Sequence, residues 1–203
     1  MNTKEAILLE SLRLFSRSGY EAVSVRDIAK QLGITQGALY KHYSSKKDIF
    51  DSIVNRMRQN DYERAQMFQV PEGSFLEMAE EYGNTPMEQI KHFTEAQFYY
   101  WTEDEFASGF RKMLTIEQYR SPEMTKLYQQ YLAAGVVGYV EDLFREISKQ
   151  RGWKSHNSKQ LALEFYAPIY MLMNLYDGTE NKEEVIIQMR EHINHFTQVM
   201  EKE

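Results

Sequence analysis

The segment between residues 35 and 46 contains side chains that can hydrogen-bond to the bases and phosphates of a nucleic acid. Gln36 carries an amide that can donate and accept at once, as an adenine base requires. Gly37 and Ala38 are small enough to let a backbone approach a groove closely. Groups that suit phosphate oxygens follow at Tyr40, Lys41, His42 and Lys46. This chemistry predicts a segment that enters DNA, with Gln36 reading a base.

Two short helices are expected to position these groups. Ser24 and Asp27 have the spacing of a capping box at the start of the first helix. Gly33 suits the left-handed residue that ends a helix, and Thr35 can cap the second helix. The apolar face of the first helix is formed by Val25, Ile28, Ala29 and Leu32. The pattern predicts a helix-turn-helix whose second helix, about seven residues long, lies in the major groove.

The residues expected at DNA come from both helices and from the start of the next one. They are Ser24, Val25, Arg26, Thr35, Gln36, Gly37, Ala38, Tyr40, Lys41, His42 and Lys46. Tyr40 and Tyr43 have an alternative role to a DNA contact, because either side chain could instead pack the second helix onto the first helix of the chain. The pattern favours Tyr43 for that buried position and Tyr40 for the phosphate contact.

The sequence GITQGALYKHYSSKKDIF, residues 33–50, resembles the signature of TetR-type transcriptional regulators, T-x-G-x-L-Y-x-H-F-x-S-K-x-x-L. The matching positions are Thr35, Gly37, Leu39, Tyr40, His42, Ser45 and Lys46, and Tyr43 replaces the commoner Phe. The resemblance covers about the first quarter of the chain. The resemblance implies that Tyr40 and His42 contact the DNA backbone. It also implies that the rest of the chain contains a cavity for an inducer.

Charge is distributed unevenly along the chain. Residues 1–60 carry ten basic and six acidic side chains, a net charge of +4. Because the whole chain carries −6, the other 143 residues carry −10. A basic end on an acidic body concentrates phosphate affinity where the helix-turn-helix is predicted.

Composition excludes several classes of protein. The chain has no cysteine, so disulfides, zinc fingers and thiol chemistry are excluded. Its first residues do not have the pattern of a signal peptide. The longest apolar stretch, residues 161–176, contains Glu164, Pro168 and Asn174 and is shorter than the ~20 residues of a membrane span. We therefore expect a cytoplasmic protein with no membrane partner.

Enzyme chemistry finds little support. No nucleophile elbow, P-loop or dinucleotide fingerprint is present. His192 and His195 with Glu191, and Glu88 with His92, share helix faces, but neither group has further metal ligands in register. We expect no catalytic residue, no metal and no cofactor.

The rest of the chain is expected to be helical, giving an all-α protein of about nine to ten helices. A long fourth helix from Ser45 to about Phe68 would join residues 1–47, the helix-turn-helix domain, to residues 48–203, a ligand-binding and dimerisation domain. Later helices are expected at 75–82, 87–101, 103–119, 121–150, 158–176 and 182–200. Pro168 should kink the helix that contains it.

The predicted second domain is rich in aromatic residues, which are typical of cavities that bind small organic molecules. The candidate ligand-binding residues are His92, Phe93, Tyr99, Tyr100, Phe110, Met113, Tyr128, Tyr131, Tyr166 and Tyr170. Any one of these could simply fill a core. Glu95, Glu103 and Asp104 could form a negative wall or a solvated face, so the expected ligand is aromatic or cationic.

The last two helices are expected to form a dimer interface, because residues 161–176 are apolar on nearly all sides. The candidates are Phe165, Ile169, Leu172, Val185, Met189, Ile193, Phe196 and Met200. The alternative is that this stripe packs only within its own chain.

Together these features predict a homodimeric DNA-binding repressor that a small molecule releases from a palindromic operator. One alternative is a regulator or activator without a ligand. Another is a helical small-molecule-binding protein whose N-terminal domain contacts other proteins.

Overall fold

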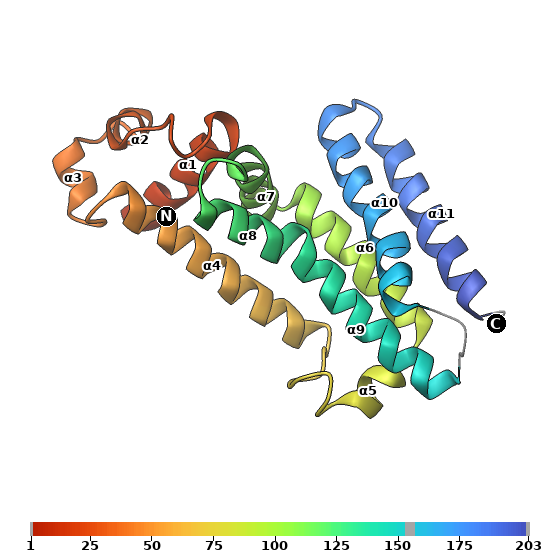
Figure 1. Cartoon of the computed structure of the whole chain (residues 1–203). Coiled ribbons are helices and arrows are strands. Elements are labelled where there is room, and N and C mark those ends of the chain that lie inside the picture. Colours follow the sequence, from red (N-terminus) through yellow and green to blue (C-terminus); the bar gives the residue numbers. More distant parts are fainter. Residues whose placement is uncertain (1, 153–156, 202–203) are drawn as a thin grey trace. The chain divides into compact units, whose positions relative to one another are not determined.

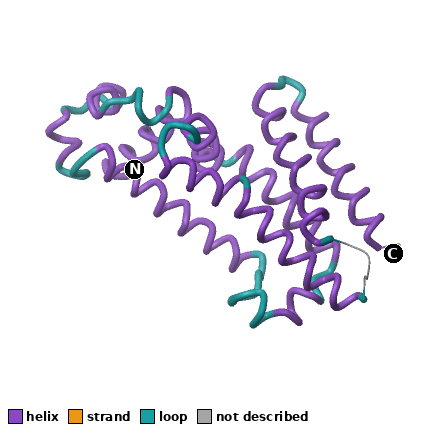
Figure 2. The backbone as a smooth tube through the Cα atoms, viewed as in Figure 1, coloured by secondary structure: helices purple, strands orange, loops and turns teal. Residues whose placement is uncertain are grey.

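The structure, a computed structural model, describes residues 2–152 and 157–201. Within these ranges all regular structure is α-helical, with eleven helices and no strand (Figure 2). The low content of helix-breaking residues, four prolines and ten glycines, is consistent with this result. The predicted all-α fold is confirmed, and no helix of the described residues is long and apolar enough to cross a membrane.

The chain forms two units, each with its own dense set of contacts (Figure 1). The N-terminal unit comprises Met1–Met67 and Glu103–Tyr128. The C-terminal unit comprises Phe68–Thr102 and Gln129–Glu203. These units are defined by packing, so the functional division at residues 47 and 48 stays a prediction.

The N-terminal unit is built around its first helix, which contacts three others. Its helices are α1 (Thr3–Ser18), α2 (Val25–Gln31), α3 (Gln36–Tyr40), α4 (Lys46–Met67), α7 (Glu105–Glu117) and most of α8 (Pro122–Leu132). Phe15 on α1 and Phe50 on α4 are fully buried, and Tyr20 packs against both rings. Gly109 on α7 brings that helix close to Leu12, since a Cβ there would lie 3.3 Å from the Leu12 Cγ. The apolar face of α1 thus organises this core.

The C-terminal unit has a separate hydrophobic core. Its helices are α5 (Ala79–Gly83), α6 (Met87–Glu103), α9 (Ala134–Arg151), α10 (Ser158–Gly178) and α11 (Lys182–Glu201). Helix α10 packs against α9 and α11, and α5 packs against α9. The rings of Phe144, Phe165 and Phe196 meet in this core, with centroids 4.9–5.4 Å apart. Helix α10 continues through Pro168 as one helix.

The predicted helix over residues 121–150 is wrong, because the structure has two helices there. Helix α8 ends at Leu132 and α9 begins at Ala134, with Ala133 in a non-helical conformation (φ −136°, ψ −107°). Just beyond this break, a Cβ on residue 135 would lie 2.1 Å from the Gln130 carbonyl oxygen, so only glycine fits there. A second expected helix, over residues 75–82, is shorter and begins at Ala79.

Candidate nucleic-acid interface and internal cavity

Side-chain caps fix the start of each short helix near the N-terminus. The Ser24 hydroxyl accepts from the Asp27 amide (3.2 Å), while the Asp27 carboxylate accepts from the Ser24 amide (2.9 Å). The Ser24 hydroxyl and amide, both donating to Asp27, lower the pKa of that carboxyl. The Thr35 hydroxyl accepts from the Ala38 amide (3.1 Å) at the start of α3. The predicted capping box and the predicted cap at Thr35 are both confirmed.

The turn between α2 and α3 depends on Gly33, which has a left-handed backbone (φ +67°). The Gly33 amide donates to the Lys30 carbonyl (3.2 Å), and the Ile34 amide donates to the Ala29 carbonyl (3.0 Å). A residue with a side chain would be strained at this φ. The two helices therefore meet at the tight turn that the sequence predicts.

Helix α3 presents one face to its own unit and the other to solvent. Leu39 is fully buried, whereas Tyr40 next to it is 51% exposed. Gln36, Gly37 and Lys41 are also exposed. Helix α3 covers only the five residues Gln36–Tyr40, fewer than the seven that we expected, and the chain continues through a turn at Lys41 and His42. The polar groups that could read DNA thus lie on the free side of a helix anchored by Leu39.

Tyr43 takes the buried position that the sequence favours for it. The side chain is only 2% exposed. Its hydroxyl donates to the Lys4 carbonyl on α1 (3.2 Å), and the Lys4 ammonium lies 5.3 Å from the centre of the ring. Tyr43 therefore ties the end of the helix-turn-helix to α1 and is not available for DNA.

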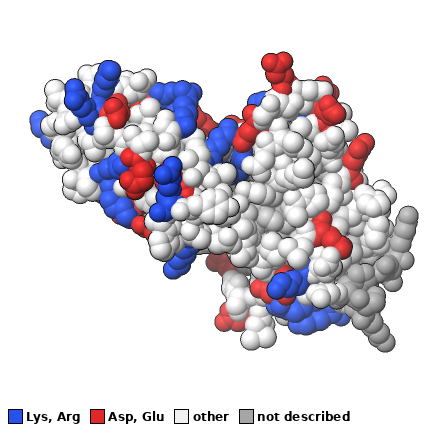
Figure 3. Space-filling view, turned by 45° about the horizontal axis from the view of Figure 1, so that its top comes forward, with Lys and Arg blue, Asp and Glu red and all other residues white. Residues whose placement is uncertain are grey.

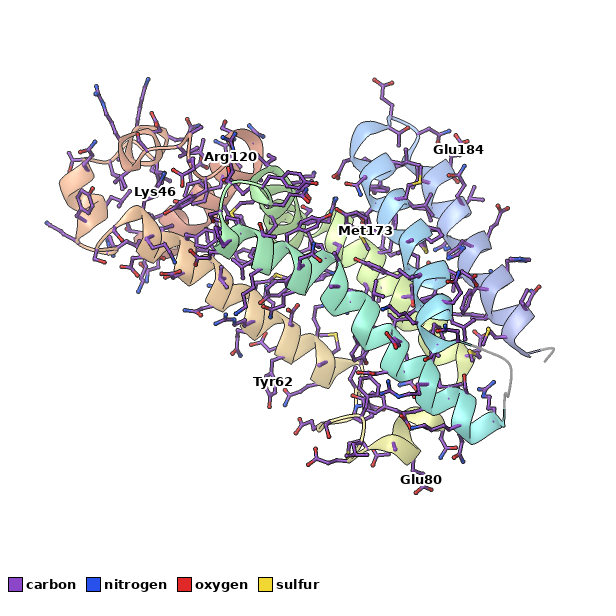
Figure 4. The ribbon with its side chains drawn as sticks, in the orientation of Figure 1. Lys46, Tyr62, Glu80, Arg120, Met173 and Glu184 are labelled. Atoms are coloured by element: carbon purple, nitrogen blue, oxygen red, sulfur yellow. The ribbon has the colours of Figure 1, made fainter. Side chains whose placement is uncertain are left out.

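Lys46 has a different place from the one that we predicted. Its ammonium donates to the carbonyls of Tyr20 (2.9 Å) and Val23 (3.1 Å) and lies 4.2 Å from the centre of the Tyr20 ring. Figure 4 labels this side chain at the start of α4. The charge is thus directed into the loop that connects α1 and α2, where it satisfies backbone oxygens. A direct phosphate contact by this ammonium would break those bonds.

Other basic groups of the N-terminal unit lie at its surface, where Figure 3 shows several Lys and Arg side chains on the visible face. Arg26, Lys30 and Lys41 are exposed. Lys47 instead pairs with two acids, Asp51 and Glu123, within the same unit. Arg26, Lys30 and Lys41 can therefore meet phosphates without first breaking an ion pair that the structure shows.

The C-terminal unit contains a cavity of about 150 Å³. Its walls come mainly from α6, α9 and α10, with further residues from α5, from the end of α8 and from the segment that follows α4. Met173, labelled in Figure 4, lines it from α10. The lining residues are Phe68, Val70, Pro71, Tyr82, Thr85, Gln89, Ile90, Phe93, Thr94, Gln97, Trp101, Tyr131, Leu132, Val136, Tyr139, Val140, Leu143, Phe165, Tyr166, Ile169 and Met173. The wall is mainly apolar and aromatic, as small-molecule sites are.

Most hydroxyls in the cavity wall already bond to the protein. The Thr94 hydroxyl donates to the Ile90 carbonyl (2.7 Å), and the Tyr166 hydroxyl donates to the Leu132 carbonyl (3.0 Å). Gln97 differs, because its amide has no hydrogen-bond partner among the described residues. Gln97 therefore offers a donor and an acceptor to whatever occupies the cavity.

Two tyrosines connect the cavity to the segment after α4. The Tyr139 hydroxyl donates to the Tyr82 hydroxyl, which donates to the Pro71 carbonyl (3.1 Å). Burial raises the pKa of both hydroxyls, and the shared hydrogen bond raises the pKa of Tyr139 further. The Phe75 ring stacks on Tyr82 with centroids 4.0 Å apart. We call this Tyr139–Tyr82–Pro71 chain the tyrosine relay.

Of the ten residues predicted to bind a ligand, only Phe93, Tyr131 and Tyr166 line the cavity. Phe110 and Met113 are fully buried in the N-terminal unit, where α7 packs on α1, so they serve as core. Four others belong to the C-terminal unit, and Tyr128 belongs to the N-terminal unit, but none of these five lines the cavity. The four are His92, Tyr99, Tyr100 and Tyr170.

Several wall residues were missed although a pattern for them exists. Gln89, Phe93, Gln97 and Trp101 are four residues apart on α6 and share one face. Tyr99 and Tyr100, two residues of this helix that were predicted together with Phe93, lie off that face and do not line the cavity. Tyr82 and Tyr139 come from different helices, and nothing local in the sequence indicates that they meet.

The three acids that could have formed a negative wall, Glu95, Glu103 and Asp104, do not line the cavity. The Glu95 carboxylate accepts from the Arg190 guanidinium (Nε–Oε1 2.7 Å). The Asp104 carboxylate accepts from the Ala107 amide (2.8 Å) and caps α7. Glu103 is also absent from the cavity wall. The described residues contain no group of three or more potential metal ligands.

The prediction for the dimer interface identified residues that lie in the protein's own core. All eight are at most 9% exposed within a single chain, so they cannot face a partner. Their stripe faces α9 and the other core residues of the C-terminal unit, as the alternative proposed. The eight are Phe165, Ile169, Leu172, Val185, Met189, Ile193, Phe196 and Met200.

Comparison with known proteins places residues 7–53 in the family described as "Bacterial regulatory proteins, tetR family". Over 51 residues, the chain is 45% identical to the HTH-type transcriptional regulator AcrR of Shigella flexneri. That match covers 25% of this chain and 24% of AcrR, so the sequence similarity spans about a quarter of each protein.

Solved structures resemble nearly the whole chain. The fatty acid degradation regulator FadR from Bacillus halodurans aligns with a TM-score of 0.65 and 14% identity, over 97% of this chain and 95% of FadR. SmeT, the repressor of a multidrug efflux pump of Stenotrophomonas maltophilia, has been solved with triclosan. That complex aligns with a TM-score of 0.63 and 17% identity, over 95% of this chain and 90% of SmeT. At these identities the likeness shows a shared fold.

The family match coincides with the helix-turn-helix, which lies within residues 7–53. The fold of the remaining chain agrees with solved structures of the same family. Over residues 7–53, which include the helix-turn-helix, this chain resembles the tetR family of bacterial regulatory proteins.

Proposed function

We propose that the protein is a homodimeric transcriptional repressor that a small molecule releases from a palindromic operator. The outward face of α3 is the observation that carries this proposal. Gln36, Tyr40 and Lys41 are exposed there, while Leu39 anchors the helix from behind. Gln36 would read a base edge, and Tyr40, Lys41 and His42 would hold phosphates.

The length of α3 supports a dimer. Its five residues extend about 7.5 Å at ~1.5 Å per residue, so one copy reaches only a few base pairs. Specific binding exceeds non-specific binding by about 4–10 kcal/mol, which so short a contact does not provide. Two copies related by a two-fold axis would contact half-sites about 34–36 Å apart, or a multiple of that distance.

The outward faces of α10 and α11 are the best candidate surface for the second copy. Large apolar side chains are exposed there although the opposite faces are buried in the core. Those on α10 lie eight and four residues apart, which places them on one side of the helix. The exposed residues are Leu163, Met171, Leu175, Ile187 and Val199. The last two helices thus remain the proposed interface, through faces other than those predicted.

A matched pair of variants tests this surface. Leu175 is 46% exposed on α10, and Leu76 is 89% exposed on a turn of the same unit. Leu175→Glu should convert the dimer to a monomer in sedimentation equilibrium, because it places a charge in an apolar contact. Leu76→Glu introduces the same charge elsewhere and should leave the dimer intact. Dissociation by both variants, or by neither, would remove these faces as the interface.

The cavity supports a ligand-controlled switch. Pro71, at the end of the tyrosine relay, follows the last residue of α4 by four positions. We propose that a ligand in the cavity disturbs the relay and that α4 carries the change toward the helix-turn-helix. To move operator occupancy from 99:1 to 1:99, the ligand must favour the DNA-incompetent state by about 5.5 kcal/mol.

Footprinting on the DNA that flanks the protein's own gene tests the function as a whole. The proposal predicts protection of two inverted half-sites, and loss of that protection when a ligand is added. Gln36→Ala should change base preference at one position in each half-site without altering the salt dependence. Protection of a single half-site by a monomer would contradict the proposal. As a regulator that binds DNA, the protein would act in the cytoplasm.

A further inference from the structure

We propose that the cavity of the C-terminal unit selects uncharged ligands, apolar molecules of one or two rings whose single polar group pairs with Gln97. This inference rests on the proposed ligand-controlled function and identifies the class of ligand. It keeps the aromatic ligand that the sequence suggests and drops the cationic one, because the structure shows which groups face the cavity.

The absence of charge in the cavity wall is the first observation. None of the described residues that line the cavity is Asp, Glu, Lys, Arg or His. A charged ligand would lose its hydration on entry and would find no opposite charge to replace it. Glu95, which lies on the same helix as Gln97, is paired with Arg190. Both anions and cations are therefore disfavoured.

Aromatic walls can also attract cations, so a cationic ligand is the main alternative to an uncharged one. Rings such as Phe93 and Trp101 carry a negative face that can hold an ammonium group. A desolvated ring contact returns about 2 kcal/mol, which is less than the cost of burying an unpaired charge. This wall contains no carboxylate, so the rings are expected to serve as apolar surface.

The hydrogen-bond pattern of the wall is the second observation. Thr94, Tyr166 and Tyr82 donate to backbone carbonyls of the protein. Tyr139 donates to Tyr82. The Gln97 amide is different, because no described residue bonds to it and its donor and acceptor are both available; the Gln89 amide is also unbonded, but Gln89 is exposed at the surface whereas Gln97 is half-buried. A hydroxyl or carbonyl on the ligand can pair with it without breaking an existing bond.

The size of the cavity limits the ligand. An engineered apolar cavity of about 150 Å³ stays dry and binds benzene. The cavity here has the same volume, about 150 Å³. A molecule of one or two rings therefore fits with little expansion, whereas a large amphiphile would require the walls to move.

Three bicyclic probes of equal shape test the proposal on the full-length protein. They are 2-naphthalenemethanol, 2-naphthylmethylammonium and 2-naphthoate, which differ in the charge of their polar group. Isothermal titration calorimetry at neutral pH should show the alcohol binding at least tenfold more tightly than either ion. Equal or tighter binding of an ion, or no binding of the alcohol up to its solubility limit, would overturn the proposal.

The Gln97→Glu variant provides a second test, in which the order of probe affinities should change. A carboxylate at this position should make the ammonium the preferred probe and weaken the alcohol by about tenfold. Gln129→Glu makes the same change at an exposed position on α8, outside the cavity wall, and should leave all three affinities unchanged. Circular dichroism checks that both variants fold. If Gln97→Glu leaves the order of the probes unchanged, Gln97 does not face the ligand.

The outcome is separable from that of the proposed function. Binding of operator DNA is measured by fluorescence anisotropy of a labelled duplex, with none of the three naphthalene compounds present. A protein that binds DNA and prefers an ionic probe refutes only the ligand class. A protein that binds the alcohol but no duplex refutes only the proposed function.

Discussion

The two units of the chain use similar aromatic residues for different purposes. In the N-terminal unit, Phe15, Tyr20 and Phe50 pack ring against ring, and Phe110 and Met113 are fully buried. In the C-terminal unit, several aromatic rings surround a cavity, and their hydroxyls bond to backbone carbonyls or to one another. The comparison teaches that aromatic content does not distinguish a core from a ligand site. The distinction lies in whether the rings close on one another or leave a cavity between them.

The largest expected effect contrasts two neighbouring residues of α3. Leu39 is fully buried and Tyr40 is half exposed. Leu39→Ala should lower the free energy of unfolding by about 2–5 kcal/mol, the usual cost of such a cavity. Tyr40→Ala should change it by less than about 0.5 kcal/mol but weaken binding to every DNA sequence. Urea denaturation and DNA titration check both; a stable Leu39→Ala protein would contradict the packing described.

The next largest effect is expected from removing the Lys46 ammonium. The sequence predicts a phosphate contact for this group, whereas the structure shows it bonded to the loop between α1 and α2. Lys46→Met leaves the carbonyls of Tyr20 and Val23 without their donor and should lower stability by about 1–3 kcal/mol. Lys41→Met should leave stability unchanged and reduce the slope of log K against log salt by about 1. If Lys46→Met instead reduces only the salt slope, the contact with the loop is not formed in solution.

A pH effect of similar or smaller size is expected from Asp61 on α4. Burial raises the pKa of its carboxyl to about 6, against an ordinary value of 3.8. The folded protein therefore binds this proton more tightly than the unfolded chain. Stability from this group is fully present below about pH 4 and is lost as pH rises through about 6.

Asp61→Asn should remove this loss and raise the free energy of unfolding at pH 7 by about 1–3 kcal/mol. Thermal denaturation between pH 4 and pH 8 checks it. Glu63→Gln, an exposed position on the same helix, should leave the pH dependence as in the parent protein. A parent-like pH profile for Asp61→Asn would mean that the carboxyl is hydrated.

The smallest expected effect on stability lies in the tyrosine relay. Tyr82→Phe removes the donor to the Pro71 carbonyl and should cost about 0.5–1.5 kcal/mol. Because the relay joins the cavity to the segment after α4, the variant should also reduce the effect of a bound ligand on operator affinity. Full ligand response in Tyr82→Phe would exclude the relay from the switch.

Local sequence patterns were sufficient for most of the helix-turn-helix. The caps at Ser24 and Thr35, the left-handed Gly33 and the buried Tyr43 all follow from residues close together in the chain. The short reach of capping bonds makes such features readable without tertiary structure. Lys46 was misassigned because its partners, the carbonyls of Tyr20 and Val23, are more than 20 residues away.

The C-terminal unit was less predictable because its site is formed by distant segments. The cavity walls come from residues 68–173, and no local pattern shows which faces of α6, α9 and α10 meet. The same limit led to the wrong prediction for Phe110 and Met113, which belong to the N-terminal unit and pack in its core where α7 meets α1. The buried stripe from Val185 to Met200 was recognised as a packing seam, yet sequence alone could not say whether it faced its own core or a partner.

The central claim is that the outward face of α3 binds DNA, and titration of a fluorescent operator duplex at several salt concentrations tests it most directly. The parent protein should bind as a dimer, with affinity falling steeply as salt rises because phosphate counterions are released. Tyr40→Ala should bind far more weakly at every salt concentration while remaining folded. A chain that binds no duplex at low salt, or a Tyr40→Ala variant that binds as well as its parent, would contradict the account.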